Sequence, residues 1–237
     1  MDGYKELEEK VLAFLDAHDW ESAFSFVKNG DMQGDGNATA ILAEFYLYGL
    51  GIPEDAEKAV ELFEKACTRG CAEAADRLGS LYIIGEKVPQ DESKGMSYIM
   101  KAAEMGNSFS MSKLADMYLN GDGVNKDYRK SLEWGLRAAN LGDKNGMEVV
   151  AVIYDDGLGV YRDPAQASYW YRKCLQREPE DTFCLYRLAV CLADPFEVFH
   201  IHSTQENGTY TCHMNSTFSK NYFPDCIFRS APYVYYQ

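Results

Sequence analysis

The stretch LADMYLNGDGVNKD, residues 114–127, decides the fold of this chain of 237 residues. Its first part, residues 114–118, spaces apolar side chains along one face of a helix. Gly121 and Gly123 then end that helix, because glycine enters the left-handed backbone region without a Cβ clash. Asp127 follows as the N-cap of a second helix. The stretch therefore predicts a helix, a glycine turn and a second helix.

The same pattern returns every 36 residues. The repeated positions are the tyrosines Tyr46, Tyr82, Tyr118 and Tyr154, the glycines Gly49, Gly85, Gly121 and Gly157, the aspartates Asp55, Asp91, Asp127 and Asp163, and the small residues Ala43, Gly79, Ala115 and Ala151. Self-similarity at this period is typical of a solenoid. We therefore predict an all-α, right-handed α–α superhelix. The small residues let two helices approach closely, and the tyrosines fill the space between helix pairs.

The repeated residues resemble the Sel1-like repeat (SLR), a relative of the tetratricopeptide repeat. The resemblance rests on Leu114-Ala-x-x-Tyr118-x-x-Gly121-x-Gly123-Val, then Asp127, then Ala138-Ala139-x-x-Gly142, and it covers residues ~38 to ~175 in four copies. It implies a scaffold for protein–protein interaction and does not choose a pathway. Two copies depart from the pattern. The second has Glu86-Lys87 where the second turn glycine belongs, and the fourth lacks the closing glycine.

Three segments are expected. Residues 1–37 form capping helices or a degenerate repeat, and residues 38–195 form four repeats followed by a last helix near Phe183–Ala193. Residues 196–237 form an atypical, aromatic-rich tail, with short strands or extended segments expected at Val198–His202 and Tyr233–Tyr236. Three interpretations of the tail stay open: it covers the last repeat, it is an exposed ligand-like segment, or it is an atypical end without a selected fold.

The charge composition limits the chemical class of partner. A net charge of −14 disfavours nucleic acid and anionic membrane surfaces, whereas a basic peptide or protein is compatible. The alternative interpretation is that the negative charge only keeps the protein soluble. The start of the chain is not a secretory signal and no apolar run is long enough to span a membrane, so we expect a cytoplasmic protein. Seven cysteines without regular spacing predict free, mostly buried thiols.

The resemblance implies that the first helix of each pair lines the concave face. The expected partner-binding residues are Glu44, Tyr48, Asp76, Ser80, Ile84, Asp116, Asn120, Glu148 and Asp156, with Ala40, Ser112 and Val152 on the same face. This set is mostly acidic or polar, with an apolar spot at Tyr48 and Ile84. It suits an extended or helical peptide that carries basic residues. The alternative is that these are ordinary solvated helix positions.

No catalytic constellation is visible, so we expect a non-enzyme without cofactor or metal. His18 is the only histidine before residue 196, and Asp155 and Asp156 are adjacent and point about 100° apart on a helix. One alternative is a metal- or thiol-handling protein that uses the tail residues His200, His202, Cys212, His213 and Cys226, whose spacing matches no standard zinc module. Another is a hydrolase of the cysteine-rich penicillin-binding or β-lactamase type, to which some family members are linked. The oligomeric state stays open.

Overall fold

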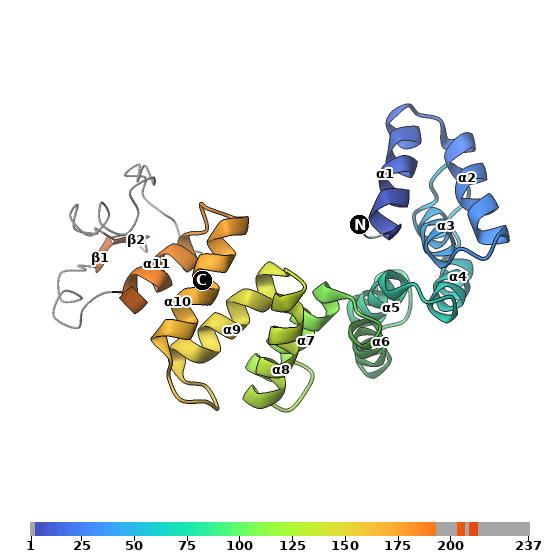
Figure 1. Ribbon diagram of the computed structural model, residues 1–237. Coiled ribbons are helices and arrows are strands. Elements are labelled where there is room, and N and C mark those ends of the chain that lie inside the picture. Colours follow the sequence, from blue (N-terminus) through green and yellow to red (C-terminus); the bar gives the residue numbers. More distant parts are fainter. Residues whose placement is uncertain (1–2, 193–202, 207–208, 213–237) are drawn as a thin grey trace.

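The computed structural model describes residues 3–192, 203–206 and 209–212, which form eleven helices and one two-stranded hairpin (Figure 1). The helices are α1 (Gly3–Asp16), α2 (Trp20–Met32), α3 (Gly36–Tyr48), α4 (Ala56–Thr68), α5 (Ala72–Ile84), α6 (Glu92–Glu104), α7 (Ser108–Asn120), α8 (Tyr128–Asn140), α9 (Lys144–Asp156), α10 (Pro164–Arg177) and α11 (Thr182–Leu192). The hairpin pairs β1 (Ser203–Glu206) with β2 (Thr209–Cys212) antiparallel. The strands expected at 198–202 and 233–236 lie outside the described residues.

The helices form a curved row of antiparallel pairs (Figure 1). The pairs α3/α4, α5/α6, α7/α8 and α9/α10 are the four predicted repeats, with α1 and α2 before them and α11 after them. First helices also contact one another, α3 with α5 and α7 with α9. In Figure 1, α5 and α7 lie on the inner side of the arc, and α6 and α8 on the outer side. No helix among the described residues combines the length and apolarity that a membrane span requires.

The caps at the helix ends explain the repeated glycine and aspartate. Gly49, Gly85, Gly121 and Gly157 all end a first helix in the left-handed conformation, with φ between 65° and 84°. Asp55, Asp91, Asp127 and Asp163 each cap a second helix by accepting backbone N–H groups. The second repeat differs as expected. Gly51, Gly123 and Gly159 have a positive φ at the second turn position, whereas Lys87 at the same position of the second repeat does not.

The small residues allow the two helices of a pair to touch. Ala43, Ala115 and Ala151 are fully buried. A Cβ added to Gly79 would lie 2.5 Å from Cδ1 of Ile99 and 3.0 Å from the carbonyl oxygen of Gly95 on the facing helix. Even one methyl group would therefore force α5 and α6 apart.

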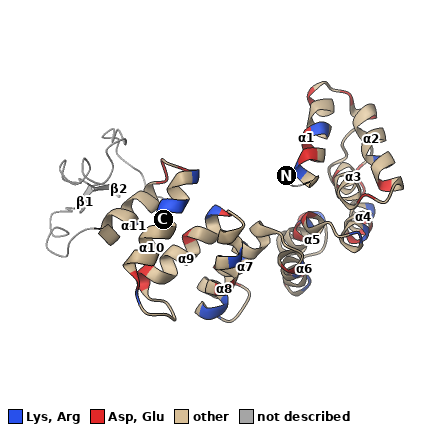
Figure 2. Ribbon diagram, in the orientation of Figure 1, with Lys and Arg blue, Asp and Glu red and all other residues tan. Residues whose placement is uncertain are grey.

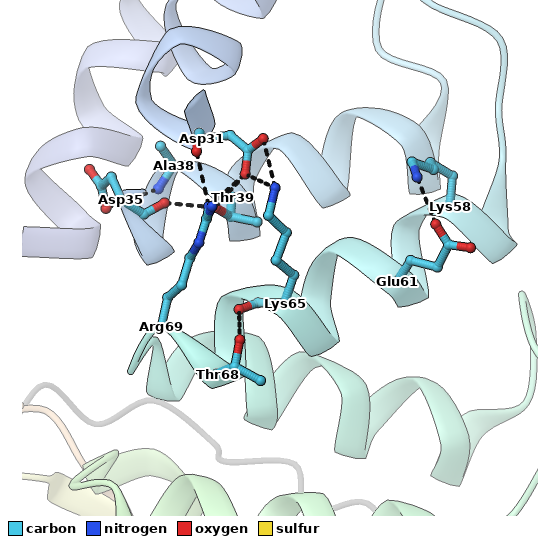
Figure 3. Close-up of polar contacts among 9 residues, drawn as sticks. All are labelled: Asp31, Asp35, Ala38, Thr39, Lys58, Glu61, Lys65, Thr68 and Arg69. Carbon is cyan, nitrogen blue, oxygen red and sulfur yellow. Dashed lines mark hydrogen bonds and ion pairs between the residues drawn. The ribbon is translucent and has the colours of Figure 1, made fainter. Parts of the chain in front are cut away.

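The first repeat is joined to the N-terminal helices through Asp31, at the end of α2 (Figure 3). Its carboxylate accepts hydrogen bonds from the Thr39 hydroxyl (2.9 Å), the Arg69 guanidinium (2.7 Å) and the Lys65 ammonium (2.7 Å). Burial raises the pKa of Asp31, but these three hydrogen bonds lower it by more, so the pKa lies below its ordinary value of 3.8. One carboxylate thus connects α2 to α3 and α4.

Replacing Gly121 with alanine should destabilise the chain by about 1–2 kcal/mol, because a Cβ is strained at φ 84°. Asn140→Ala, at an exposed helical position, is the matched control and should change stability by less than about 0.5 kcal/mol. Urea unfolding followed by circular dichroism measures both. Equal stability of the two variants would show that the glycine turn is not a constraint.

Asp31→Asn should destabilise the chain by about 1–3 kcal/mol at neutral pH, because it removes a charged acceptor from three donors. A carboxyl with a lowered folded pKa stabilises above its unfolded pKa and loses that effect as pH falls through the folded value. The difference from wild type should therefore shrink as the pH falls below 3.8 and through the lower folded pKa. Urea unfolding at neutral pH and at a series of acidic pH values is the measurement, with exposed Asp16→Asn as control. A difference that persists in acid would contradict the assigned role.

Candidate protein-interaction surface

The predicted concave residues lie on the first helices, but they are not equally accessible. Tyr48 and Ile84 are 54% and 62% exposed at the ends of α3 and α5, and Asp116 and Asn120 are also exposed on α7. The residues Glu44, Asp76, Ser80, Glu148 and Val152 are half-buried.

Two expected positions are wrong. Ala40 and Ser112 are buried rather than concave. Ala40 packs into the core of the first repeats, and the Ser112 hydroxyl donates to the carbonyl oxygen of Phe109 within α7. Both side chains are almost fully buried, so a partner cannot reach them.

Several acidic residues of this face are used inside the solenoid. Glu44 of α3 pairs with Arg77 of α5 at 3.1 Å, and Asp76 of α5 pairs with Lys113 of α7 at 3.2 Å. Lys113 also donates to the hydroxyl of Ser80 (3.2 Å). Arg77 and Lys113 are 36 residues apart, so the same repeat position carries the cation in both cases. Sequence reasoning missed these cations because it considered the acidic positions alone.

The last repeat uses its paired aspartates in the same way. Asp155 is 4% exposed and accepts from the guanidinium of Arg187 on α11 at 2.7 Å, while Arg162 lies 3.4 Å away. The hydroxyl of Tyr171 also donates to Asp155 (3.4 Å). The neighbouring Asp156 pairs with the same Arg187 at 2.6 Å but is 44% exposed. Together these contacts connect α9 to the closing helix.

A cleft of about 480 Å³ opens between α1, α5, α7 and the turn after α8. Its apolar lining includes Phe109 and Leu141, which are 50% and 59% exposed. Charged groups line it as well, namely Lys5 and Glu8 from α1 and Glu73, Asp76 and Arg77 from α5. The contribution of α1 was missed, because the sequence presents that helix as a cap with no repeat position.

Helix α9 carries three acidic residues and one basic residue, whereas α7 carries one of each. Burial raises the pKa of Glu148, and the nearby charges of Asp181 and Asp116 raise it further, while Lys144 opposes them. The largest of these effects is burial, so the raised pKa reflects the desolvation of this carboxyl as well as its acidic neighbours.

One cluster of potential metal ligands occurs among the described residues: Glu148, Asp181 and Cys184. The ammonium group of Lys144 already forms an ion pair with Asp181, and Asp181 accepts the backbone N–H of Cys184 (3.0 Å). A hydrogen bond with Cys174, together with burial, raises the pKa of the Cys184 thiol. The carboxylate of Asp181 therefore already accepts two donors, and the cluster contributes to the contact between α9 and the start of α11.

The tail residues considered for zinc, His200, His202, His213 and Cys226, lie outside the described residues, and Cys212 is in β2. The described cysteines whose side chains are placed are free thiols: Cys67, Cys71, Cys174, Cys184 and Cys191. Burial, the largest effect, raises the pKa of Cys71 to about 12, so this thiol is not a reactive thiolate.

The adjacent aspartates provide a matched test of these assignments. Asp155→Asn should cost about 2–4 kcal/mol of stability, because it leaves the half-buried Arg187 with a weaker partner in the interior. Asp156→Asn removes an exposed pair and should cost less than about 1 kcal/mol. Urea unfolding of the two variants gives the comparison. Similar losses for both would contradict the structural role of Asp155.

Comparisons with known proteins agree with the fold and with the presence of four repeats. The family model described as Sel1 repeat matches residues 37–71, 72–107, 108–143 and 146–173. No curated protein matches the chain significantly.

Two solved structures are similar over most of the chain. One is a Sel1 repeat protein from Oxalobacter formigenes, with 27% identity and a TM-score of 0.65, over 78% of this chain and 73% of that one. The other is c5321, a protective antigen of uropathogenic Escherichia coli with an SLR fold. It has 25% identity and a TM-score of 0.67, over 80% of this chain and 41% of that one. Sel1 repeat proteins generally mediate protein–protein interactions. With four matched repeats stacked as helix pairs, the chain belongs to the Sel1 repeat family.

Proposed function

We propose that this protein is a non-catalytic adaptor that binds a protein or peptide on the inner side of its solenoid. The observation that carries the proposal is the cleft between α1, α5 and α7, where Phe109 and Leu141 expose apolar surface beside charged groups. Apolar anchors inside a polar rim are typical of peptide-binding surfaces.

The side chains on the inner side of the solenoid indicate which chemical groups the partner would carry. An apolar side chain would cover Phe109 and Leu141, and basic groups would meet Glu8 in the cleft or Asp116 and Glu148 along α7 and α9. The acids Glu44 and Asp76 contribute less, because Arg77 and Lys113 already neutralise them. The preferred partner is therefore an apolar segment with a few basic residues.

Two further features support the wider proposal. The part of the chain before residue 196 has no histidine besides His18, which leaves a serine or cysteine nucleophile without its usual base. The free described thiols suit a reducing compartment, so we place the protein in the cytoplasm.

The test is a double substitution, Phe109→Asp with Leu141→Asp, compared with Met32→Asp and Tyr161→Asp. The control residues are 76% and 98% exposed and line none of the cleft. Both variants should keep the helical circular dichroism of wild type. Affinity purification with quantitative mass spectrometry should recover the same partners with wild type and control. The cleft variant should lose them, and binding to the main partner should weaken at least tenfold, about 1.4 kcal/mol.

Retention of all partners by the cleft variant would exclude the inner cleft as the binding surface. The absence of a specific partner for any version would contradict the adaptor proposal itself.

A further inference from the structure

The outer helices change charge along the solenoid (Figure 2). Helix α4 carries two basic and three acidic residues, and α6 carries two of each. Helix α8 carries three basic residues and one acidic residue, and α10 carries three basic residues and no acidic one. The six basic residues are Arg129, Lys130, Arg137, Arg172, Lys173 and Arg177, which we call the outer basic patch. Such a patch is unexpected in a chain of net charge −14.

The charges of the outer basic patch are not neutralised within the described structure. On α4 and α6, three lysines pair with carboxylates: Lys58 with Glu61, Lys65 with Asp31 and Lys94 with Glu64. None of the ion pairs among the described residues involves the six residues of the patch. Instead, Arg137 stacks on Trp134, 4.1 Å from the ring centre, and Lys173 lies 5.7 Å from the ring centre of Tyr169.

The three patch residues on α10 also line hollows whose shape can hold a chain. A groove of about 370 Å³ runs between the end of α8 and α10, lined by Asn140, Tyr169, Lys173, Gln176 and Arg177 among others. A second hollow of about 380 Å³ on α10 shares three of these residues and adds Arg172. Neither lining contains a carboxylate from the described residues. Tyr169 is 50% exposed and contacts Trp170 edge to face, which gives the groove an apolar floor.

We propose that the outer basic patch is a second interaction surface, which binds a short acidic protein segment. Asp and Glu side chains of the segment would pair with Arg172, Lys173 and Arg177, and one apolar side chain would pack on Tyr169. The patch lies on the outer helices, and the cleft of the proposed function lies on the inner ones. The solenoid can therefore hold two partners of different charge at once.

The charge distribution favours a short segment over a membrane or a nucleic acid. A duplex or an anionic bilayer extends beyond the patch and brings negative charge against the acidic remainder of the chain. A peptide of about ten residues can place its charge on α10 and the end of α8 alone. Because single exposed ion pairs contribute little, binding requires several pairs together and should weaken as salt is added.

The test measures fluorescence anisotropy of a labelled ten-residue peptide of glutamate and aspartate with one central leucine. Wild type is compared with Arg172→Glu/Lys173→Glu/Arg177→Glu. The matched control is Lys28→Glu/Lys58→Glu/Lys101→Glu, which changes the net charge equally at exposed positions outside the patch. The same peptide with lysine at every acidic position, a single-stranded ten-nucleotide RNA and vesicles containing phosphatidylserine serve as competing probes. Circular dichroism checks that each variant is folded.

The patch variant should bind the acidic peptide at least tenfold more weakly, while the control stays within about twofold of wild type. Tyr169→Ala, which leaves every charge in place, should also weaken binding. Equal losses in the two triple variants would reduce the effect to net charge and overturn the proposal. Stronger binding of RNA, vesicles or the lysine peptide, or no binding of the acidic peptide, would overturn it as well.

Discussion

The close approach of the two helices in each pair is the constraint on which the rest of the structure depends. It requires a small residue in the middle of the first helix, as Gly79 shows against Ile99 and the Gly95 carbonyl. It also requires the chain to reverse between the helices, which a glycine in the left-handed conformation provides. These two features recur every 36 residues, so each helix pair has the geometry of the pair before it. The first helices then line the inner side of the arc (Figure 1).

Stacking then determines which charges remain for partners. The pairs are joined by contacts from one repeat to the next, such as Glu44 with Arg77 and Asp76 with Lys113. These ion pairs neutralise some of the carboxylates on the inner side. The exposed apolar groups of the cleft therefore lie beside fewer unpaired carboxylates. On the outer side the opposite occurs toward α10, where basic residues have no carboxylate partners in the described structure. The two sides therefore differ in their surface chemistry.

The fold was predictable because repetition averages out the uncertainty of any single element. The four repeats and their aspartate caps follow from positions that recur at a fixed spacing, whereas the last helix near Phe183 was predicted as a cap where that pattern fades. The interaction surface was less predictable, since it depends on contacts between repeats. Glu44 looks like a free concave acid until stacking brings Arg77 beside it. The residues of α1 that line the cleft occupy no repeat position, so the repeat pattern does not predict them. The net charge of the whole chain is negative and therefore does not indicate a local cluster of basic residues.

Hydrogen–deuterium exchange of the full chain with its main purified partner would test the central claim most directly. If the inner side is the binding surface, the partner should slow exchange in α1, the beginning of α5 and the beginning of α7. The outer helices α4 and α6 should exchange as they do in the free protein. Slower exchange in the outer helices alone, with unchanged exchange in α1 and at the beginnings of α5 and α7, would contradict the account.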